Sequence, residues 1–158
     1  MTIIDEQHVH AHADLCFEIA ADVERWPSIL PHYRWVRFRD KQAFGTGIVE
    51  MSAFRRFPAG LNYPTWWVSQ MRADESEHAV YYTHVEGVTR GMDVKWELQP
   101  RGSETFIRLF HTWDGPAWPL IRTAAAKLVI LPHFVSAIAQ RTLAGVAREA
   151  ESRSSMKS

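Results

Sequence analysis

The chain has 158 residues, with 18 basic and 18 acidic side chains, so its formal net charge is zero. This balance gives no electrostatic reason to expect nucleic acid or an anionic membrane as a partner. The single cysteine, Cys16, excludes an internal disulfide framework and is typical of a reducing compartment.

Several further features predict a globular cytoplasmic protein. The N-terminal residues MTIIDEQ carry acids and no apolar core, so no signal peptide is visible. The longest apolar stretch, residues 124–131, is too short to span a bilayer. We expect one domain over residues 1–152, followed by a disordered tail over residues 153–158.

The predicted elements follow a simple order along the chain. Residues 3–13 alternate like a strand, and residues 13–26 have helical spacing that ends at Trp26-Pro27. Alternating apolar residues then predict six strands, at 33–40, 45–54, 65–72, 79–86, 92–99 and 105–113. Turn residues between them predict consecutive antiparallel hairpins. A helical segment over residues 118–151, divided at Pro132, closes the chain.

This order predicts an α+β fold. A curved antiparallel sheet of six to seven strands would wrap around the long C-terminal helix, with a pocket between them. The chain has 7 Trp, 8 Phe and 4 Tyr, and these aromatic residues either fill a large core or line a ligand cavity.

Four stretches resemble the START-like, helix-grip superfamily and its polyketide cyclase/dehydrase branch. They are DVERWPSILPHYRWV (22–36), WVSQMRAD (67–74), VKWEL (94–98) and RLFHTWD (108–114). The resemblance covers nearly the whole chain and implies a helix-grip fold with a hydrophobic cavity and no cofactor. Some members of this branch cyclise and aromatise a poly-β-ketone carried on acyl carrier protein. Others bind lipids, quinones or hormones without chemistry.

The resemblance also implies three pocket residues of the aromatase/cyclases: a tyrosine, an arginine and a glutamine. The tyrosine position falls on Tyr33, whereas the arginine position falls on Met71 and the glutamine position falls on His111. Arg72 is one residue late and would face the other side of its strand.

Tyr33 and His111 are the predicted catalytic pair. A cavity imidazole can donate a hydrogen bond to a ligand carbonyl or act as a general acid or base, and a phenolic hydroxyl can donate similarly. The alternative is that both are buried residues with local hydrogen bonds. The predicted pocket wall consists of Trp26, Trp67, Ser69, Met71, Trp96, Leu109 and Trp113. Tyr82 and His84 share a strand face with Glu86, which predicts that they point outward.

The histidine row HVHAHAD, residues 8–14, raises the question of a zinc site. The resemblance implies that Val9 and Ala11 face inward in the first strand, which leaves His8 and His10 in solvent and His12 at the start of the helix. No acidic or cysteine cluster nearby in the sequence completes a metal shell, so we predict no metal site.

Three functions remain open at this stage. The first is a cyclase/dehydrase-like enzyme acting on a hydrophobic, carbonyl-rich substrate, with delivery by acyl carrier protein left open. The second is a non-catalytic carrier of a lipid, quinone or aromatic product in the same cavity. The third is a partner-binding scaffold with a collapsed, Trp-filled cavity. Residues 117–134 are read as a lid, a portal or a contact to a second copy in a homodimer, with ordinary core burial as the alternative.

Overall fold

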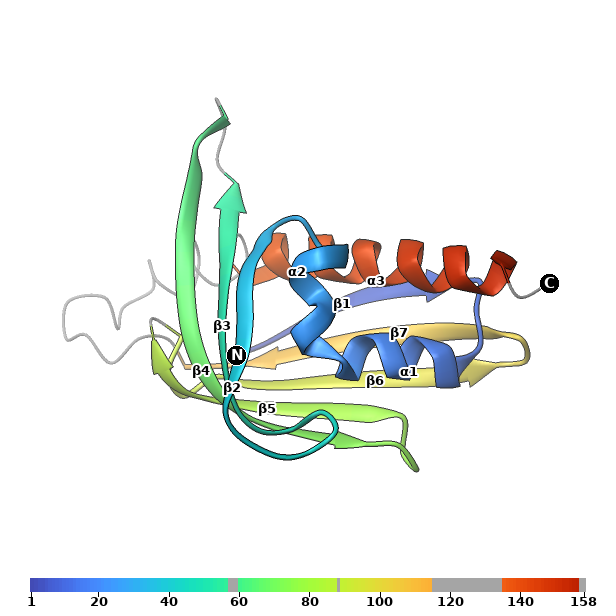
Figure 1. Ribbon diagram of the computed structural model, residues 1–158, viewed down its shortest axis with the longest axis horizontal. Coiled ribbons are helices and arrows are strands. Elements are labelled where there is room, and N and C mark those ends of the chain that lie inside the picture. Colours follow the sequence, from blue (N-terminus) through green and yellow to red (C-terminus); the bar gives the residue numbers. More distant parts are fainter. Residues whose placement is uncertain (57–59, 88, 115–134, 157–158) are drawn as a thin grey trace.

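The computed structural model describes residues 1–56, 60–87, 89–114 and 135–156. The elements run in the order β1 (Thr2–Val9), α1 (Ala13–Ala21), η1 (Val23–Arg25), α2 (Trp26–Ile29), β2 (Tyr33–Ala43), β3 (Thr46–Arg56), β4 (Asn62–Asp74), β5 (Ala79–Gly87), β6 (Asp93–Arg101), β7 (Glu104–Thr112) and α3 (Ser136–Met156) (Figure 1). The predicted lid or dimer segment, residues 117–134, lies outside the described residues. Within the described parts of the chain, no helix combines the length and the apolar character that crossing a membrane requires.

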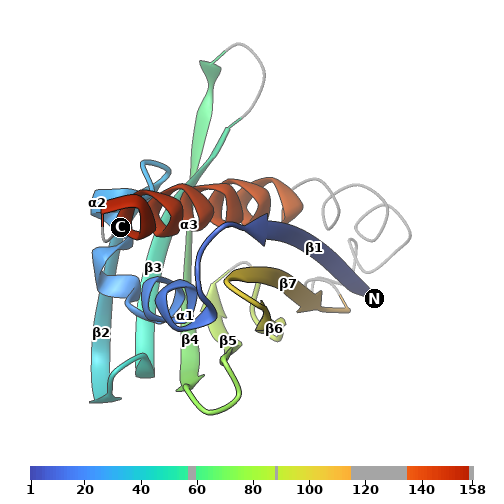
Figure 2. The same ribbon diagram turned by 90° about the vertical axis from the view of Figure 1, so that its right-hand side faces the viewer.

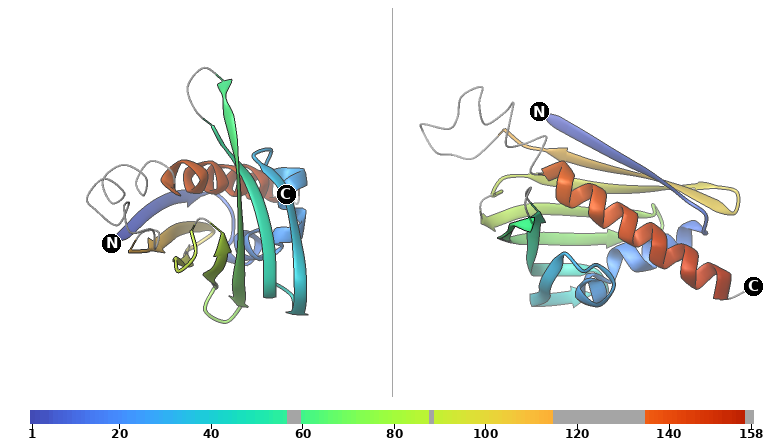
Figure 3. Two further views of the ribbon diagram at one scale, coloured as in Figure 1. Left: turned by 90° about the vertical axis from the view of Figure 1, so that its left-hand side faces the viewer. Right: turned by 90° about the horizontal axis from the view of Figure 1, so that it is seen from above.

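The seven strands form one antiparallel sheet in the order β1-β7-β6-β5-β4-β3-β2. The sheet curves around α3, with β1 at one edge and β2 at the other (Figures 2 and 3). This arrangement confirms the predicted α+β helix-grip fold. The two edge strands, β1 and β2, follow each other in the chain and are joined through α1, η1 and α2. These short helices therefore close one end of the curved sheet.

Alternation along the central strands sets the concave face. In β7 the buried positions are Thr105, Ile107, Leu109 and His111, and the intervening residues are only partly buried. The β6–β7 hairpin turns at Gly102, whose φ of +65° lies in the left-handed region that glycine adopts without strain. The period of two therefore directs alternate side chains of these strands toward α3.

Helix α3 contacts the sheet at its start and the residue after α2 near its middle. At its start, Ser136 Oγ donates to the Asp5 carboxylate of β1 at 2.9 Å, and Gln140 Nε2 donates to Asp5 Oδ1 at 3.2 Å. Further along, Gly145 faces Leu30, and a Cβ at position 145 would lie 2.2 Å from Leu30 Cδ2. The missing side chain thus lets the helix approach the residue that follows α2 closely.

The described part of the predicted tail is helical. Helix α3 continues to Met156, so residues 153–156 are helical rather than disordered. Arg153 Nε donates to Glu149 Oε1 at 2.8 Å across one helical turn, and Ser155 Oγ donates to the Ser152 carbonyl at 3.0 Å. Such contacts between residues three or four apart stabilise a last turn that has little apolar character.

The convex face carries a carboxylate held by three donors. Glu50 is 6 % exposed and accepts hydrogen bonds from Arg37 Nε at 2.6 Å, Arg39 Nη2 at 2.8 Å and Trp66 Nε1 at 3.2 Å. These donors, the two arginines above all, lower the pKa of Glu50 from 4.5 to about 2.

We predict that Glu50→Gln destabilises the protein at pH 7 by about 1–2 kcal/mol, because charge-assisted bonds are lost while the arginines stay in solvent. The folded-state pKa is depressed, so the contribution is full above the ordinary value of 4.5 and disappears as the pH falls through about 2. Urea unfolding at pH 7, 4 and 3 should show the difference between the two proteins narrowing. Glu86→Gln, which removes an exposed partner of Arg39, is the control and should change stability little. A difference that does not depend on pH would contradict the prediction.

Candidate functional site

The concave face of the sheet and α3 enclose a cavity of about 80 Å³. Its described wall is mostly apolar and draws on α2, all strands except β1, the connection between β5 and β6, and the first turns of α3. The lining residues are Trp26, Tyr33, Met51, Thr65, Trp67, Tyr82, His84, Thr89, Met92, Val94, Trp96, Leu109, His111, Val135, Ile138, Ala139 and Thr142. The helix-grip arrangement thus places a cavity where the sequence predicted one.

Four aromatic side chains form a connected wall. The ring centroids of Trp26 lie 5.1 Å from Tyr33 and 5.8 Å from Trp96, and those of Tyr33 and Trp67 lie 6.3 Å apart. Trp26 is fixed at the start of α2 because its Nε1 donates to the Ile19 carbonyl of α1 at 3.0 Å. Its one polar atom is therefore satisfied by protein, and the remaining ring surface is apolar.

Tyr33 begins β2 and reaches α3 through Thr142. Thr142 Oγ1 lies 2.9 Å from His32 Nε2 and 3.5 Å from the Tyr33 hydroxyl, and it donates to the Ile138 carbonyl at 2.8 Å. Because the threonine has one proton and gives it to the Ile138 carbonyl, the Tyr33 hydroxyl can bond to Thr142 only as the donor, across a long 3.5 Å. Burial raises the pKa of Tyr33 to about 12, so its hydroxyl stays protonated.

Two residues of the cavity wall, Tyr82 and His111, carry buried polar atoms that have no hydrogen-bond partner within the described residues. These atoms are the Tyr82 hydroxyl and His111 Nδ1, on side chains that are 5 % and 8 % exposed in total. The neighbouring His84 is different, because its Nδ1 lies 2.6 Å from Thr89 Oγ1 and its ring stacks on Trp67 at 5.8 Å. An unpartnered buried polar group costs about 1–3 kcal/mol, which is recovered when a ligand or water supplies the bond.

The two cavity imidazoles are uncharged at neutral pH. Burial lowers the pKa of His84 to about 3 and that of His111 to about 4, and proximity to His111 adds to the effect on His84. Burial also raises the pKa of Tyr82 well above 10. The site therefore offers neutral donors and acceptors rather than charged groups.

The prediction that Tyr82 and His84 face outward is wrong, and a β-bulge explains why. The prediction grouped them with Glu86 on the assumption of strict alternation. Where β4 advances by one residue, β5 advances by two, from Glu86 to His84. The extra residue, Val85, reverses which face the following side chains take, so Glu86 is exposed while Tyr82 and His84 are buried.

The structure places six of the nine predicted site residues on the cavity wall: Trp26, Tyr33, Trp67, Trp96, Leu109 and His111. Ser69, Met71 and Trp113 are buried and do not belong to the described lining. Ser69 and Met71 follow Trp67 along β4, nearer its end at Asp74, beyond the part that borders the cavity. Trp113 instead donates from Nε1 to the Arg90 carbonyl at 3.1 Å and so supports the connection between β5 and β6.

We predict that the rings of His84 and His111 remain neutral from pH 8 to pH 5, as followed by ¹⁵N–¹H correlation spectra of the imidazoles. His10 is the internal control, because its hydrogen bond with Glu104 raises its pKa above 6.5. The lowered pKa values also mean that the unfolded chain takes up protons that the folded chain does not, so these two residues reduce stability progressively below about pH 6.5. Protonation of either ring near pH 6.5 would contradict the buried, neutral site.

Comparison with solved structures shows how widely this fold is shared. The Zhui aromatase/cyclase from Streptomyces sp. R1128 is 22 % identical with a TM-score of 0.75, and the match covers 97 % of this chain and 94 % of that one. A START superfamily protein from Mycobacterium smegmatis is 14 % identical with a TM-score of 0.66, covering 99 % of both chains. Major latex-like protein 151 from Panax ginseng is 14 % identical with a TM-score of 0.65, covering 91 % of this chain and 95 % of that one. At these identities the likeness concerns the fold.

A search of curated protein sequences found no match. The sequence profile of the family described as "Polyketide cyclase / dehydrase and lipid transport" matches residues 9–130. That match includes α1, α2 and all of β2 to β7, which form most of the cavity wall. Because it spans well over half of the chain, this protein belongs to the polyketide cyclase/dehydrase and lipid transport family.

Proposed function

We propose that this protein binds a hydrophobic, ring-bearing small molecule with a carbonyl or phenolic oxygen, and that it holds this ligand without chemical conversion. The observation that carries the proposal is the pair of unpartnered polar atoms, the Tyr82 hydroxyl and His111 Nδ1, on the wall of a mostly apolar, aromatic cavity. A ligand oxygen between them would satisfy both groups, while the tryptophan rings would contact its apolar body.

The cavity must widen to admit such a ligand. Its volume of about 80 Å³ is smaller than the roughly 150 Å³ of an engineered apolar cavity that holds benzene. Met51 and Met92 line the wall, and methionine side chains are unbranched and adopt new rotamers readily. We therefore expect these two side chains to move when a ligand binds.

The electrostatics of the site favour binding over acid–base catalysis. A general acid or base works best when its pKa lies near the operating pH, and the His111 pKa of about 4 is far below neutrality. The position that the family resemblance gives to an arginine holds Met71, an apolar side chain outside the described lining. No cation among the described lining residues stands ready to stabilise an enolate.

To test binding, the matched pair 1-tetralone and tetralin would be titrated into the full chain and followed by tryptophan fluorescence. The ketone should bind about tenfold more tightly than the hydrocarbon, which corresponds to one hydrogen bond in a buried site. Tyr82→Phe should remove most of that advantage, whereas Tyr81→Phe should keep it because the Tyr81 hydroxyl bonds to Glu77 at the surface. Equal affinity for both compounds in the unaltered protein would overturn the proposal. Mass spectrometry of compounds extracted from freshly purified protein would then identify the natural ligand.

A second candidate function is cyclisation or dehydration of a poly-β-ketone. The observation in its favour is that Tyr33 and His111 line the same cavity in a chain of the cyclase/dehydrase family. In this case acyl carrier protein would deliver the substrate, as the resemblance implies.

We further propose a cytoplasmic location, supported by the buried free thiol of Cys16. Assembly into a homodimer stays a prediction.

With a poly-β-ketone thioester as the probe, Tyr33→Phe and His111→Ala should each reduce turnover by about a hundredfold if they act as acid or base. Trp67→Ala should mainly weaken binding, because it removes contact area. Circular dichroism of each variant would check that the fold is retained. Absence of turnover in the unaltered protein, or turnover unchanged in both variants, would remove this mechanism and leave the binding proposal untouched.

A further inference from the structure

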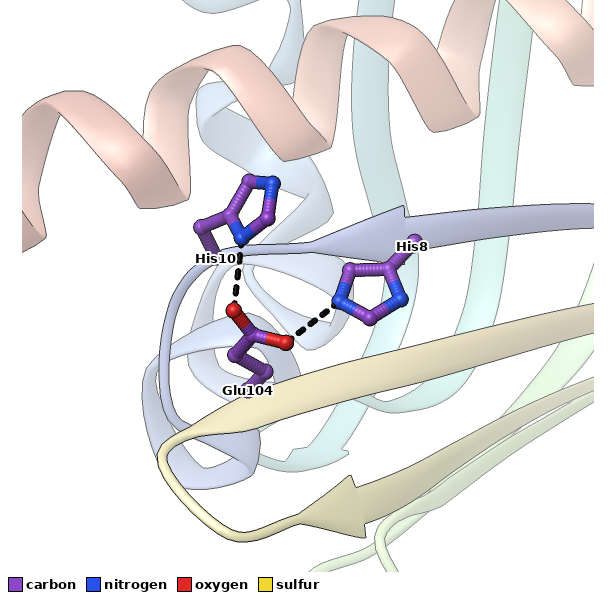
Figure 4. Close-up of side chains that lie close together, drawn as sticks. All are labelled: His8, His10 and Glu104. Atoms are coloured by element: carbon purple, nitrogen blue, oxygen red, sulfur yellow. Dashed lines mark hydrogen bonds and ion pairs between the residues drawn. The ribbon is translucent and has the colours of Figure 1, made fainter.

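His8 of β1 and His10, which directly follows that strand, converge on the carboxylate of Glu104 at the start of β7, on the solvent side of the sheet edge (Figure 4). His8 Nε2 lies 2.7 Å from Glu104 Oε2, and His10 Nδ1 lies 2.8 Å from Glu104 Oε1. The two imidazole centroids are 5.1 Å apart. None of the three residues belongs to the described lining of the cavity.

The strand register explains why these side chains meet. In the antiparallel β1–β7 ladder, His8 pairs with Phe106 and Val9 pairs with Thr105. The residues that would form the next pair are His10, just past the end of β1, and Glu104, the first residue of β7. His8 and His10 are two residues apart and therefore share one face. The histidine row has no acid in its own stretch of sequence, and Glu104, the first residue of β7, supplies one across the strand pair.

We propose that His8, His10 and Glu104 bind one divalent transition-metal ion, with Zn²⁺ as the best match. One potential ligand atom from each residue lies within 4.8 Å of the others. Two imidazole nitrogens and a carboxylate oxygen form a known three-ligand set for zinc, with water in the fourth position. Zinc binds its ligands at about 2.0–2.1 Å, so two ligand atoms of a tetrahedral site lie about 3.4 Å from each other. Small side-chain rotations would bring the three ligand atoms of this cluster to that separation.

The location suggests what such an ion would do. Glu151 of α3 accepts a hydrogen bond from the His10 backbone N–H at 3.2 Å, so three elements meet at this point. Glu151 is nine residues beyond Thr142, or about 14 Å farther along the helix than the cavity. A bound ion would tie β1 to β7 beside the C-terminal half of α3, and it would be a structural tie outside the ligand cavity.

The competing explanation is that the same contacts are ordinary hydrogen bonds between imidazoles and a carboxylate. Isothermal titration calorimetry of ZnCl₂ into chelator-treated full-length chain, carrying no histidine tag, separates the two. We expect one Zn²⁺ per chain, together with an increase in the unfolding temperature that grows with Zn²⁺ concentration. Loss of a residue that only supports a metal ligand costs about 10- to 100-fold in metal affinity. His10 and Glu104 would bind the ion directly, so His10→Gln and Glu104→Gln should each weaken Zn²⁺ binding by more than about 100-fold.

His12→Gln is the matched control, since His12 is exposed on the same row but does not belong to the cluster. It should bind Zn²⁺ as the unaltered chain does. The proposal is overturned if the unaltered chain binds no stoichiometric Zn²⁺ at 100 micromolar (roughly the weakest affinity of interest here). It is equally overturned if His10→Gln and Glu104→Gln keep the affinity, or if His12→Gln loses it. Unfolding curves without metal show whether each variant folds.

Discussion

The close packing of α3 on the concave face of the sheet is the contact on which the cavity depends. The helix contributes Ile138, Ala139 and Thr142 to the wall, and Val135 directly before it adds a fourth residue, so the distance of the helix from the strands determines the cavity volume. Asp5 anchors its first turn through Ser136 and Gln140, and near its other end Glu151 accepts a hydrogen bond from the backbone of His10, just after β1. Between these anchors, Thr142 joins the helix to His32 beside the start of β2. Polar contacts at both ends thus flank an apolar middle that can enclose a ligand.

Burial shapes the cavity and also limits its chemistry. The same apolar surroundings that would bind an aromatic ligand keep His84 and His111 neutral and the tyrosine hydroxyls protonated. Catalysis of an aldol reaction would need a charge-stabilising group at the reacting carbonyl, and the described wall carries only neutral polar groups. Within this family the fold is compatible with either outcome, so the difference between an enzyme and a carrier lies in a few inward-facing positions.

The fold was largely predictable because its strands alternate regularly and its turns carry strong signals. The inward faces of β6 and β7 follow directly from the period of two, which is why Trp96, Leu109 and His111 could be placed on the cavity wall. Gly87, two residues after the bulge at Val85, ends β5, where a glycine is also typical of an ordinary turn, so the inward orientation of His84 was not predictable. The meeting of His10 with Glu104 depends on the register between the first and last strands. That register is a long-range property set by the packed sheet rather than by either sequence segment.

Gly145 has a consequence for how the cavity can diversify in evolution. A side chain there would collide with Leu30, which is fully buried and lies between α2 and β2. The helix or the loop around Leu30 would then have to retreat, and the wall residues one turn earlier in α3 would retreat with it. Position 145 therefore acts as a spacer that sets cavity depth without touching the ligand, so changes in ligand size between relatives need not appear among the residues that line the cavity.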